Sequence, residues 1–451
     1  MIQRNLTQQL ENWKRRNNRK PLIVRGARQV GKTTLVKQFG QGFSRYIYLN
    51  LELPQDRELF ERFDDIKLLL QALFLRERVS SEQTELLLFI DEIQESPKAI
   101  QSLRYFKEYF PKLYVIAAGS LLEHALSNVQ SFPVGRVEYL NLHPVNFEEF
   151  LAAANPQAYR LLDEVPIPAF AHTVLLQYFH QYAIVGGLPE VLAAFVESQE
   201  FTALVPLYES LIQSFKDDVG KYARNATKAK VLRHIITTAP FEADSRIKFQ
   251  HFGNSNYPSR EVGEAMRSLE LAGLLKLIYP TTALELPALP DLKKSPRLQL
   301  LDTGMMNYQA GIQKDLLGLH DLSDAFRGKI IQHLVTQQVI STQYLPSYQP
   351  MFWVREKSDA QAEVDLVYAY RSWLMPVEVK AGKQGKLRSL HQFMERVPHH
   401  FAVRYHANAF SVEKATTPSG KVFYLMNLPY FLSTRLELYL DWFVLEYPLS
   451  Q

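Results

Sequence analysis

The sequence predicts an α/β fold in which a parallel sheet, covered by helices, is followed by a helical middle and a second α/β region. Over residues 1–150, short apolar runs alternate with helix-like patterns, which is typical of parallel strands joined by helices. A glycine-rich loop separates the first apolar run from the helix that follows it. Within residues 362–380, two strand-like runs carry acidic side chains at positions that a hairpin can bring together.

The composition is that of an ordinary soluble globular protein. Of its 451 residues, 47% are hydrophobic and 22% are charged. No apolar run reaches the roughly 18 residues of a membrane span, and the N-terminal residues lack the apolar segment of a signal peptide. The absence of cysteine excludes disulfides and thiolate zinc sites, which suits a cytoplasmic protein. The net charge is only +4, and the basic residues within positions 14–28 form either a phosphate-facing surface or a solvated helix face.

The first apolar run, residues 21–24, leads into a loop with the pattern G-x-x-x-x-G-K-[ST] and then into a helix. In such a loop, backbone N–H groups point at phosphate oxygens, and the positive end of the helix faces the same anion. Lys32 supplies a charge for the β- and γ-phosphates, and Thr33 supplies a hydroxyl ligand for Mg²⁺. A glycine turn with an incidental lysine is the alternative, but strand, loop and helix all agree with a nucleotide site. The predicted phosphate-binding residues are Gly26, Ala27, Arg28, Gln29, Val30, Gly31, Lys32, Thr33 and Thr34.

A second motif follows the apolar run 86–90, which has the pattern of a buried parallel strand. Asp91 comes directly after this run and can bind Mg²⁺, while Glu92 can orient and deprotonate an attacking water. The same pair can also merely cap the helix that follows. Because the carboxyl ends of parallel strands open on one crevice, the presence of the phosphate loop favours the catalytic interpretation.

Two more polar residues are expected near this crevice. Residues 113–118 predict a strand between the loop strand and the Asp91 strand, and Ser120 follows it. Ser120 can hold the lytic water or the γ-phosphate, or it can be a helix N-cap. Arg136, which precedes a predicted strand over 137–142, can reach the phosphate of a neighbouring subunit as an arginine finger, or it can form a surface salt bridge.

Four segments together resemble the bacterial and archaeal AAA+-type ATPases that carry an uncharacterised C-terminal domain. They are GARQVGKTT, LLLFIDEIQ, the strand end AAGS, and PVGRVEYLNLHPVNFEEFL. The resemblance implies a P-loop core of the additional-strand (ASCE) type, ATP rather than GTP as the nucleotide, and assembly into a homo-oligomer. It assigns the Walker A, Walker B and sensor positions to Gly26–Thr34, Asp91 with Glu92, and Ser120.

The middle of the chain is predicted to be helical over 151–227, with a break at Gly186 and Gly187 before a new helix. Over 228–312, the order helix, turn, helix, strand, long loop, strand resembles a winged helix-turn-helix. Its second helix offers Ser259, Arg260 and Arg267 among several acids, which is a weak charge pattern for DNA. A wing that packs against protein is the alternative.

The last region, residues 313–451, carries Asp365 on one predicted strand and Glu378 with Lys380 on the next. The pattern resembles the PD-(D/E)xK restriction-endonuclease-like core, in which two carboxylates hold Mg²⁺ and the lysine lies by the water or the scissile phosphate. One departure is that Gln332 stands where an early helix of such folds usually supplies a glutamate. An exposed hairpin with a charged face is the alternative.

These observations predict an ATP-binding, ATP-hydrolysing protein that is associated with DNA and has a nuclease-like C-terminal domain of doubtful activity. Two alternatives stay open: an ATP-dependent switch whose last domain binds a protein partner, and an ATP-gated DNA nuclease in defence or repair. The predicted divisions are an ATPase domain at 1–150, a helical connector at 151–227, a winged-helix-like domain at 228–312 and a nuclease-like domain at 313–451. The predicted ligands are ATP and Mg²⁺, with no membrane contact.

Overall fold

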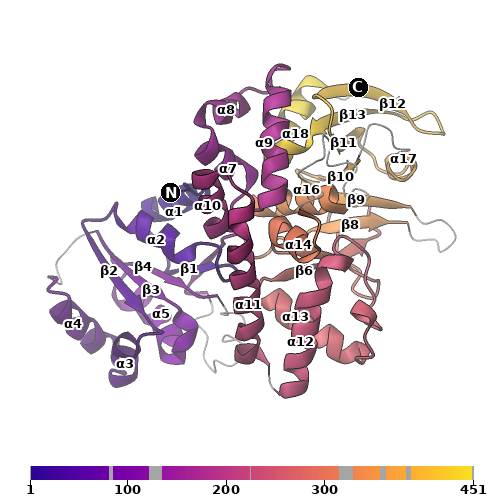
Figure 1. Cartoon of the computed structure of the whole chain (residues 1–451). Coiled ribbons are helices and arrows are strands. Elements are labelled where there is room, and N and C mark those ends of the chain that lie inside the picture. The colour runs from indigo at the N-terminus through magenta and orange to yellow at the C-terminus, as the bar shows by residue number, and fades with distance from the viewer. Residues whose placement is uncertain are drawn as a thin grey trace.

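The computed structural model describes residues 2–80, 85–120, 135–223, 225–313, 329–355, 362–381 and 387–448. Its N-terminal part contains a parallel sheet with the strand order β2-β3-β4-β1-β5 (Figure 1). The strands are β1 (Leu22–Arg25), β2 (Arg45–Asn50), β3 (Leu86–Asp91), β4 (Tyr114–Ala118) and β5 (Glu138–Asn141). Because β4 lies between β1 and β3, the additional strand that the sequence predicted at this place is confirmed.

Helices cover both faces of this sheet. Alternate residues of each strand point to opposite faces, so each strand contributes to two apolar cores. In β3, Leu87 and Phe89 belong to the apolar core on one face, while Leu88 and Ile90 belong to the core on the other. The first core contains residues of α1 (Leu6–Arg15) and α2 (Lys32–Gly40). The second contains residues of α3 (Pro54–Arg62), α4 (Ile66–Arg76) and α5 (Pro97–Tyr109). A strand buried on both faces explains the continuous apolar run over 86–90.

The middle of the chain is helical, as its sequence pattern predicts, and helices α9 to α11 form a column between the two sheets in Figure 1. Its helices are α7 (Phe147–Ala154), α8 (Pro156–Arg160), α9 (Ala171–Val185), α10 (Pro189–Ser198), α11 (Val205–Tyr222), α12 (Ala226–Thr238), α13 (Ser259–Leu271) and α14 (Thr303–Gln309).

A second, mixed sheet has the strand order β12-β13-β11-β10-β9-β8-β6-β7. Its strands are β6 (Leu275–Thr281), β7 (Arg297–Leu300), β8 (Met351–Val354), β9 (Glu363–Tyr370), β10 (Trp373–Val379), β11 (Phe401–His406), β12 (Ser411–Thr416) and β13 (Val422–Pro429). The helices of this region are α16 (Lys329–Ser341), α17 (Arg388–Met394) and α18 (Leu436–Glu446).

The elements predicted for a winged helix are present in order as α12, α13, β6 and β7, and β6 pairs antiparallel with β7. This hairpin does not stand alone, because β6 also pairs in parallel with β8 of the last region. The two predicted regions on either side of residue 312 therefore share one sheet. One apolar core runs from Val145 to Phe443 through the middle and last regions. The fourfold division of the chain itself stays a prediction.

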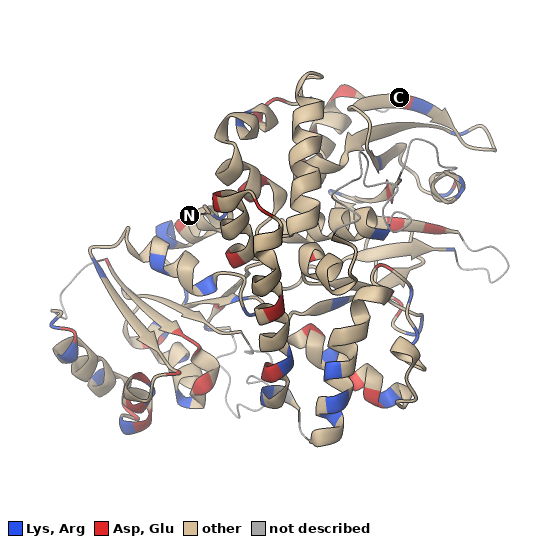
Figure 2. Cartoon of the chain, in the orientation of Figure 1, with Lys and Arg blue, Asp and Glu red and all other residues tan. Residues whose placement is uncertain are grey.

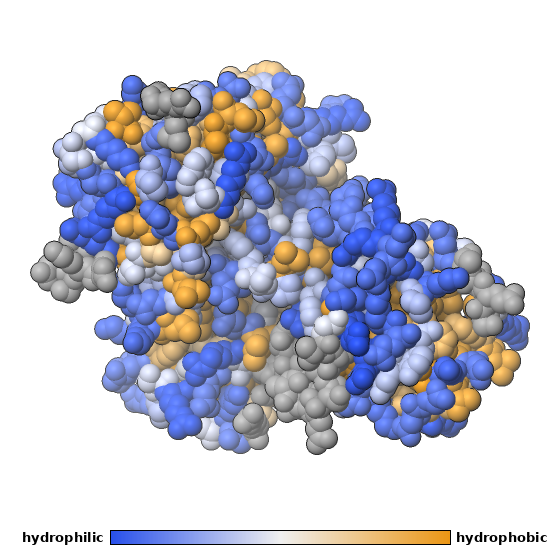
Figure 3. Space-filling view, turned by 180° about the vertical axis from the view of Figure 1, so that it is seen from behind, coloured by the Kyte–Doolittle hydropathy of each residue, from blue (hydrophilic) through white to orange (hydrophobic). Residues whose placement is uncertain are grey.

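The rear face of the molecule is predominantly hydrophilic, with hydrophobic residues in separate patches over both halves (Figure 3). Scattered apolar residues of this kind are normal on soluble surfaces. Within the described ranges, no helix combines the length and the apolarity that crossing a bilayer requires.

Candidate nucleotide-binding site

The phosphate loop joins the end of β1 to the start of α2, and its backbone turns sharply. Gly26, Gln29 and Gly31 have positive φ angles of 147°, 68° and 92°. A Cβ atom on Gly26 would lie 2.3 Å from the carbonyl oxygen of Leu142, so only glycine fits there. Gly31 is the N-cap of α2, which places the positive end of that helix at the loop.

Lys32, the first residue of α2, lies folded over this loop. Its Nζ donates hydrogen bonds to the carbonyl oxygens of Gly26 at 3.0 Å and Ala27 at 2.8 Å, and its side chain is buried. Burial lowers the pKa of Lys32 to about 8, although the carboxylates of Glu92 and Asp91 oppose this shift. The ammonium group is therefore still mainly charged at neutral pH, as binding a phosphate requires.

Thr33 and Asp91 meet beside the loop, where the sequence analysis expects both to serve Mg²⁺. The Thr33 hydroxyl donates to Oδ2 of Asp91 at 2.7 Å, and the Tyr48 hydroxyl donates to the same oxygen at 3.2 Å. Burial raises the pKa of Asp91, whereas the hydrogen bond from Thr33 favours the ionised form. A hydroxyl and a carboxylate next to a phosphate loop form a donor set that fits Mg²⁺, which prefers oxygen ligands together with phosphate and water.

Glu92 and Ser120 also lie together, across the carboxyl ends of β3 and β4. Oε2 of Glu92 accepts a hydrogen bond from Nε2 of Gln94 at 2.5 Å, and Oγ of Ser120 lies 3.4 Å from the same oxygen. Glu92 has a positive φ of 50°, a left-handed conformation that is strained for a residue with a Cβ atom. Gln94 was not singled out from the sequence. The alternative role of Ser120 as a helix N-cap concerns residues 121–134, which lie outside the described residues.

A cavity of about 490 Å³ opens beside the loop. Thr33, Thr34 and Glu92 line it, and so do residues from well outside the first sheet. These more distant lining residues include Ile2, Arg4, Val145, Pro189, Glu190 and Ala193. The volume lies in the range of small-molecule sites. Helix α10, in which the sequence singled out no residue, therefore contributes to the candidate site through its first turn.

Arg4 is a residue of this site that sequence reasoning missed. It donates from Nη1 to the carbonyl oxygen of Val30 in the loop at 2.8 Å and from Nη2 to that of His143 at 2.6 Å. Its Nε forms a buried ion pair with Glu149 at 3.0 Å. Glu149 and Asn146 form the capping box that starts α7. The capping pattern N-F-E-E is visible in the sequence, but nothing local connects it to Arg4.

Two other arginines differ in their relation to the cavity. Arg28, which lines it, forms an ion pair in which its Nη1 contacts both carboxylate oxygens of Asp218 on α11, and its Nη2 lies 4.0 Å from Glu52. Arg136 does not line the cavity. Its Nε lies 3.4 Å from Glu108 of α5, and its side chain is largely exposed. Within one chain Arg136 thus forms the surface salt bridge that was the alternative, and its action on a neighbouring subunit stays a prediction.

The hairpin of β9 and β10 brings together the residues predicted for the nuclease-like site, Asp365, Glu378 and Lys380. The backbone N–H of Val379 donates to Oδ2 of Asp365 at 2.8 Å, and Nζ of Lys380 donates to Oε1 of Glu378. Gln332 of α16 donates from Nε2 to Oδ1 of Asp365 at 2.9 Å. In the part of the chain that the structure describes, no three His, Asp or Glu side chains converge in a way suited to a metal ion.

The strand order of the first sheet, the phosphate loop and the Asp91–Glu92 pair define a P-loop ATPase domain. In agreement, residues 18–151 match the family described as AAA domain. Residues 176–316 and 327–430 match two families described as domains of unknown function, DUF8612 and DUF4143.

Comparison with solved structures finds distant likenesses only. The Walker-type ATPase paby2304 of Pyrococcus abyssi is 13% identical, with a TM-score of 0.45 over 69% of this chain and 96% of that chain. The Holliday junction branch migration motor RuvB of Thermotoga maritima is 15% identical, with a TM-score of 0.30 over 65% of this chain and 93% of that chain. A comparison with curated proteins finds no match.

Proposed function

We propose that the chain binds ATP together with Mg²⁺ and hydrolyses it. The observation that carries the proposal is the convergence of two polar pairs, Thr33 with Asp91 and Glu92 with Ser120, at the N-terminal end of α2. Lys32 and the backbone N–H groups of the loop would bind the β- and γ-phosphates. When bound, Mg²⁺ neutralises charge on these phosphates, and Thr33 with Asp91 would hold it.

In the proposed reaction, a water oxygen attacks the γ-phosphorus while the bond to the bridging oxygen breaks. ADP leaves with the electron pair of that bond, and Glu92 accepts the proton of the attacking water. The hydrogen bond from Gln94 and the nearby hydroxyl of Ser120 orient the Glu92 carboxylate, which leaves one of its oxygens for the water.

The test uses purified full-length chain with two variants of the site. Lys32→Ala should abolish nucleotide binding, because the phosphates lose their nearest cation. Glu92→Gln should bind ATP but not turn it over, because an amide cannot accept the proton. Lys112→Ala, at an exposed position that does not line the cavity, is the control and should behave as wild type. Hydrolysis by Glu92→Gln at the wild-type rate would show that another group activates the water.

Association with DNA is a second candidate function, favoured by basic residues along α12 beside the helix–helix–hairpin order (Figure 2). Lys230 and Arg233 on α12 are exposed, as are Arg260 and Arg267 on α13. However, Arg260 is already paired with Glu264 at 3.1 Å. Binding to duplex DNA should weaken with salt, and Lys230→Ala with Arg233→Ala should reduce the slope of log K against log salt by about 2. An unchanged slope would remove α12 from the DNA surface.

The two remaining alternatives differ in what they require of the last region. An ATP-gated nuclease needs a metal ion at Asp365 and Glu378, whereas an ATP-dependent switch that binds a protein partner does not. Assembly into a homo-oligomer is part of the proposal, because Arg136 lies outside the cavity of its own chain and would act as an arginine finger only on a neighbouring subunit.

A further inference from the structure

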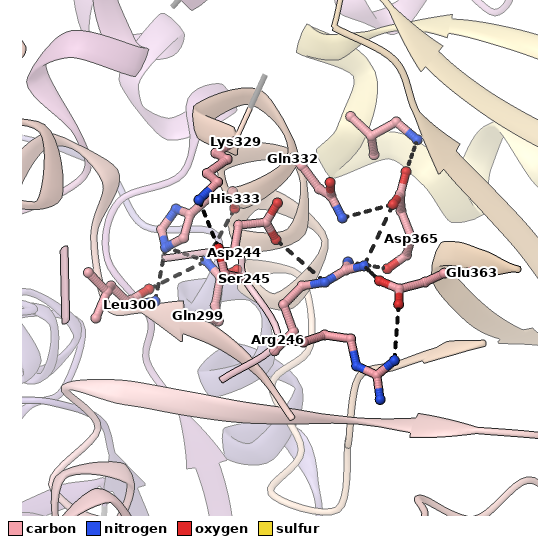
Figure 4. A network of polar contacts seen from close by, with 12 residues as sticks. Asp244, Ser245, Arg246, Gln299, Leu300, Lys329, Gln332, His333, Glu363 and Asp365 are labelled. Atoms are coloured by element: carbon pink, nitrogen blue, oxygen red, sulfur yellow. Dashed lines mark hydrogen bonds and ion pairs between the residues drawn. The ribbon is translucent and has the colours of Figure 1, made fainter. Parts of the chain in front are cut away.

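A buried arginine lies among the acidic residues of the nuclease-like cluster. Arg297, the first residue of β7, forms an ion pair through Nη2 with Glu363 of β9 and donates from Nη1 to the carbonyl oxygen of Asp365 at 2.9 Å. Figure 4 labels the carboxylates of Asp244, Glu363 and Asp365, each of which is joined to this guanidinium by a dashed line. The same Nη2 lies 3.7 Å from Oδ1 of Asp365. On its other side, Nε lies 3.9 Å from Oδ1 of the buried Asp244. One guanidinium therefore faces three carboxylates.

The position of this guanidinium is fixed by its surroundings. The side chain of Arg297 is only 6% exposed, and its guanidinium carbon lies 4.7 Å from the centre of the Phe352 ring on β8. The backbone of residue 297 pairs with Ile278 on one side and Arg246 on the other. The carboxylates raise the pKa of Arg297 although its burial acts in the opposite direction. The group is thus a permanent cation within the sheet.

The carboxylate oxygens of Asp365 and Glu378 accept hydrogen bonds from within the chain. Oδ1 of Asp365 accepts from Gln332 at 2.9 Å, and Oδ2 accepts from the backbone of Val379 at 2.8 Å. Oε1 of Glu378 accepts from Lys380, which leaves Oε2 of Glu378 without a hydrogen-bond partner among the described residues.

Mg²⁺ demands octahedral coordination by oxygen. The guanidinium of Arg297, whose Nη2 lies 3.7 Å from Oδ1 of Asp365, opposes a divalent cation at this carboxylate, and Gln332 offers only a neutral amide beside it. The residues of this cluster therefore do not fit the divalent metal that the restriction-endonuclease-like resemblance implies.

We infer that Arg297 supplies the cation of this carboxylate cluster in place of a divalent metal ion. The guanidinium neutralises Glu363 and Asp365 and ties the edge strand β7 to β9, so that the nuclease-like arrangement is retained as a structural ion cluster. The neutral glutamine at residue 332 agrees with this, because the carboxylates around Arg297 already outnumber its single positive charge and a glutamate beside Asp365 would add another negative charge. The last region then acts without metal-dependent cleavage.

A metal site in this cluster would require both the loss of the Arg297 cation and a carboxylate at residue 332. A titration can test these two requirements independently. Mn²⁺ is titrated calorimetrically into the nucleotide-free full-length chain and into Asp365→Ala. We expect no heat that depends on Asp365. Gln332→Glu alone should also add none, because Arg297 remains. Arg297→Gln combined with Gln332→Glu should give a saturable heat of Mn²⁺ binding that wild type lacks, because surrounding groups control metal affinity.

The neighbouring arginine provides a matched control. Nη1 of Arg246 lies 3.7 Å from Oε2 of Glu363, but its side chain is 38% exposed. Arg246→Gln combined with Gln332→Glu changes the net charge equally and should bind no more Mn²⁺ than wild type. An equal gain in both double variants would mean that net charge, and not the position of Arg297, limits binding, and would overturn the inference.

Unfolding temperatures keep the test decisive if Arg297→Gln folds poorly. A ligand that binds the native state raises its melting temperature. Mn²⁺ and EDTA should therefore leave the melting temperature of wild type at the same value as in buffer. A rise with Mn²⁺ in wild type that is lost in Asp365→Ala would show a working metal site and overturn the inference. Arg297→Lys, which keeps the charge, should fold and bind no Mn²⁺.

Discussion

Arg4 offers the sharpest test of how the rest of the chain positions the phosphate loop. Arg4→Met removes the ion pair with Glu149 and the hydrogen bonds to the carbonyl oxygens of Val30 and His143, while the aliphatic part of the side chain is retained. Breaking a buried pair by removing one partner costs about 3–5 kcal/mol. Glu149 keeps two backbone donors, Asn5 at 2.6 Å and Asn146 at 3.0 Å, so the lower end of that range is expected.

The same change should weaken nucleotide binding, because the loop carbonyl of Val30 loses its cationic donor. A hydrogen bond to a charged group contributes about 1.5–3 kcal/mol, so the KM for ATP should rise at least about tenfold. Urea unfolding measures the first effect and steady-state hydrolysis the second. Arg62→Met, at an exposed i,i+4 pair with Glu58, is the control and should cost less than about 0.5 kcal/mol. If Arg4→Met changes neither stability nor KM, the buried contacts of Arg4 do not position the loop.

Three further predictions follow from charged or titrating groups. Arg136→Ala should leave ATP affinity intact and reduce hydrolysis, and activity recovered on mixing with Lys32→Ala subunits would demonstrate action in trans, whereas no recovery at any ratio would count against it. Asp218→Asn should lower the KM for ATP several-fold in steady-state assays, because Arg28 loses its carboxylate partner and faces the phosphates alone; a raised KM would mean that Asp218 positions Arg28. Burial lowers the pKa of His143 to about 4. Between pH 6.5 and 4, this histidine is therefore protonated in the unfolded chain and neutral in the folded chain. Stability is therefore lost as pH falls from 6.5 towards 4, and His143→Gln should remove about 1.4 kcal/mol of the difference between the free energies of urea unfolding at pH 7.5 and pH 5.5.

The first sheet could be predicted from the sequence because its signals are local. Each signal is contained in a few consecutive residues. One is the apolar run of β3 with the two acids at its end, and another is the phosphate loop, where only glycine fits at residue 26. The order of β1, β4 and β3 followed from the resemblance and from where Ser120 had to lie. Such patterns survive in a single sequence because the backbone geometry they encode is determined by neighbours along the chain.

The strand order of the second sheet could not be predicted from local sequence patterns. The pairing of Tyr279 with Met351 joins segments that are far apart in the sequence, and no local pattern marks two strands as neighbours across such a distance. The hairpin of β6 and β7 therefore looked like a separate wing. Arg297 followed a proline-rich loop and carried no motif, so its contacts with Glu363 and Asp365 emerge only when β7 becomes the edge of the sheet.

The glycine pair before α10 is an example of a local sequence pattern that is explained by a contact with a residue far away in the sequence. From the sequence, Gly186 and Gly187 mark only a break and a helix start. In the structure, the backbone N–H of Gly187 donates to Oδ2 of Asp302 at 2.5 Å, and a Cβ atom on Gly186 would lie 2.3 Å from Oδ1 of that carboxylate. Asp302 is fully buried and also caps α14 through Met305 at 2.9 Å. Because α10 begins two residues after Gly187, this carboxylate determines where Pro189 meets the nucleotide cavity, and the glycines are required by a residue more than a hundred positions away.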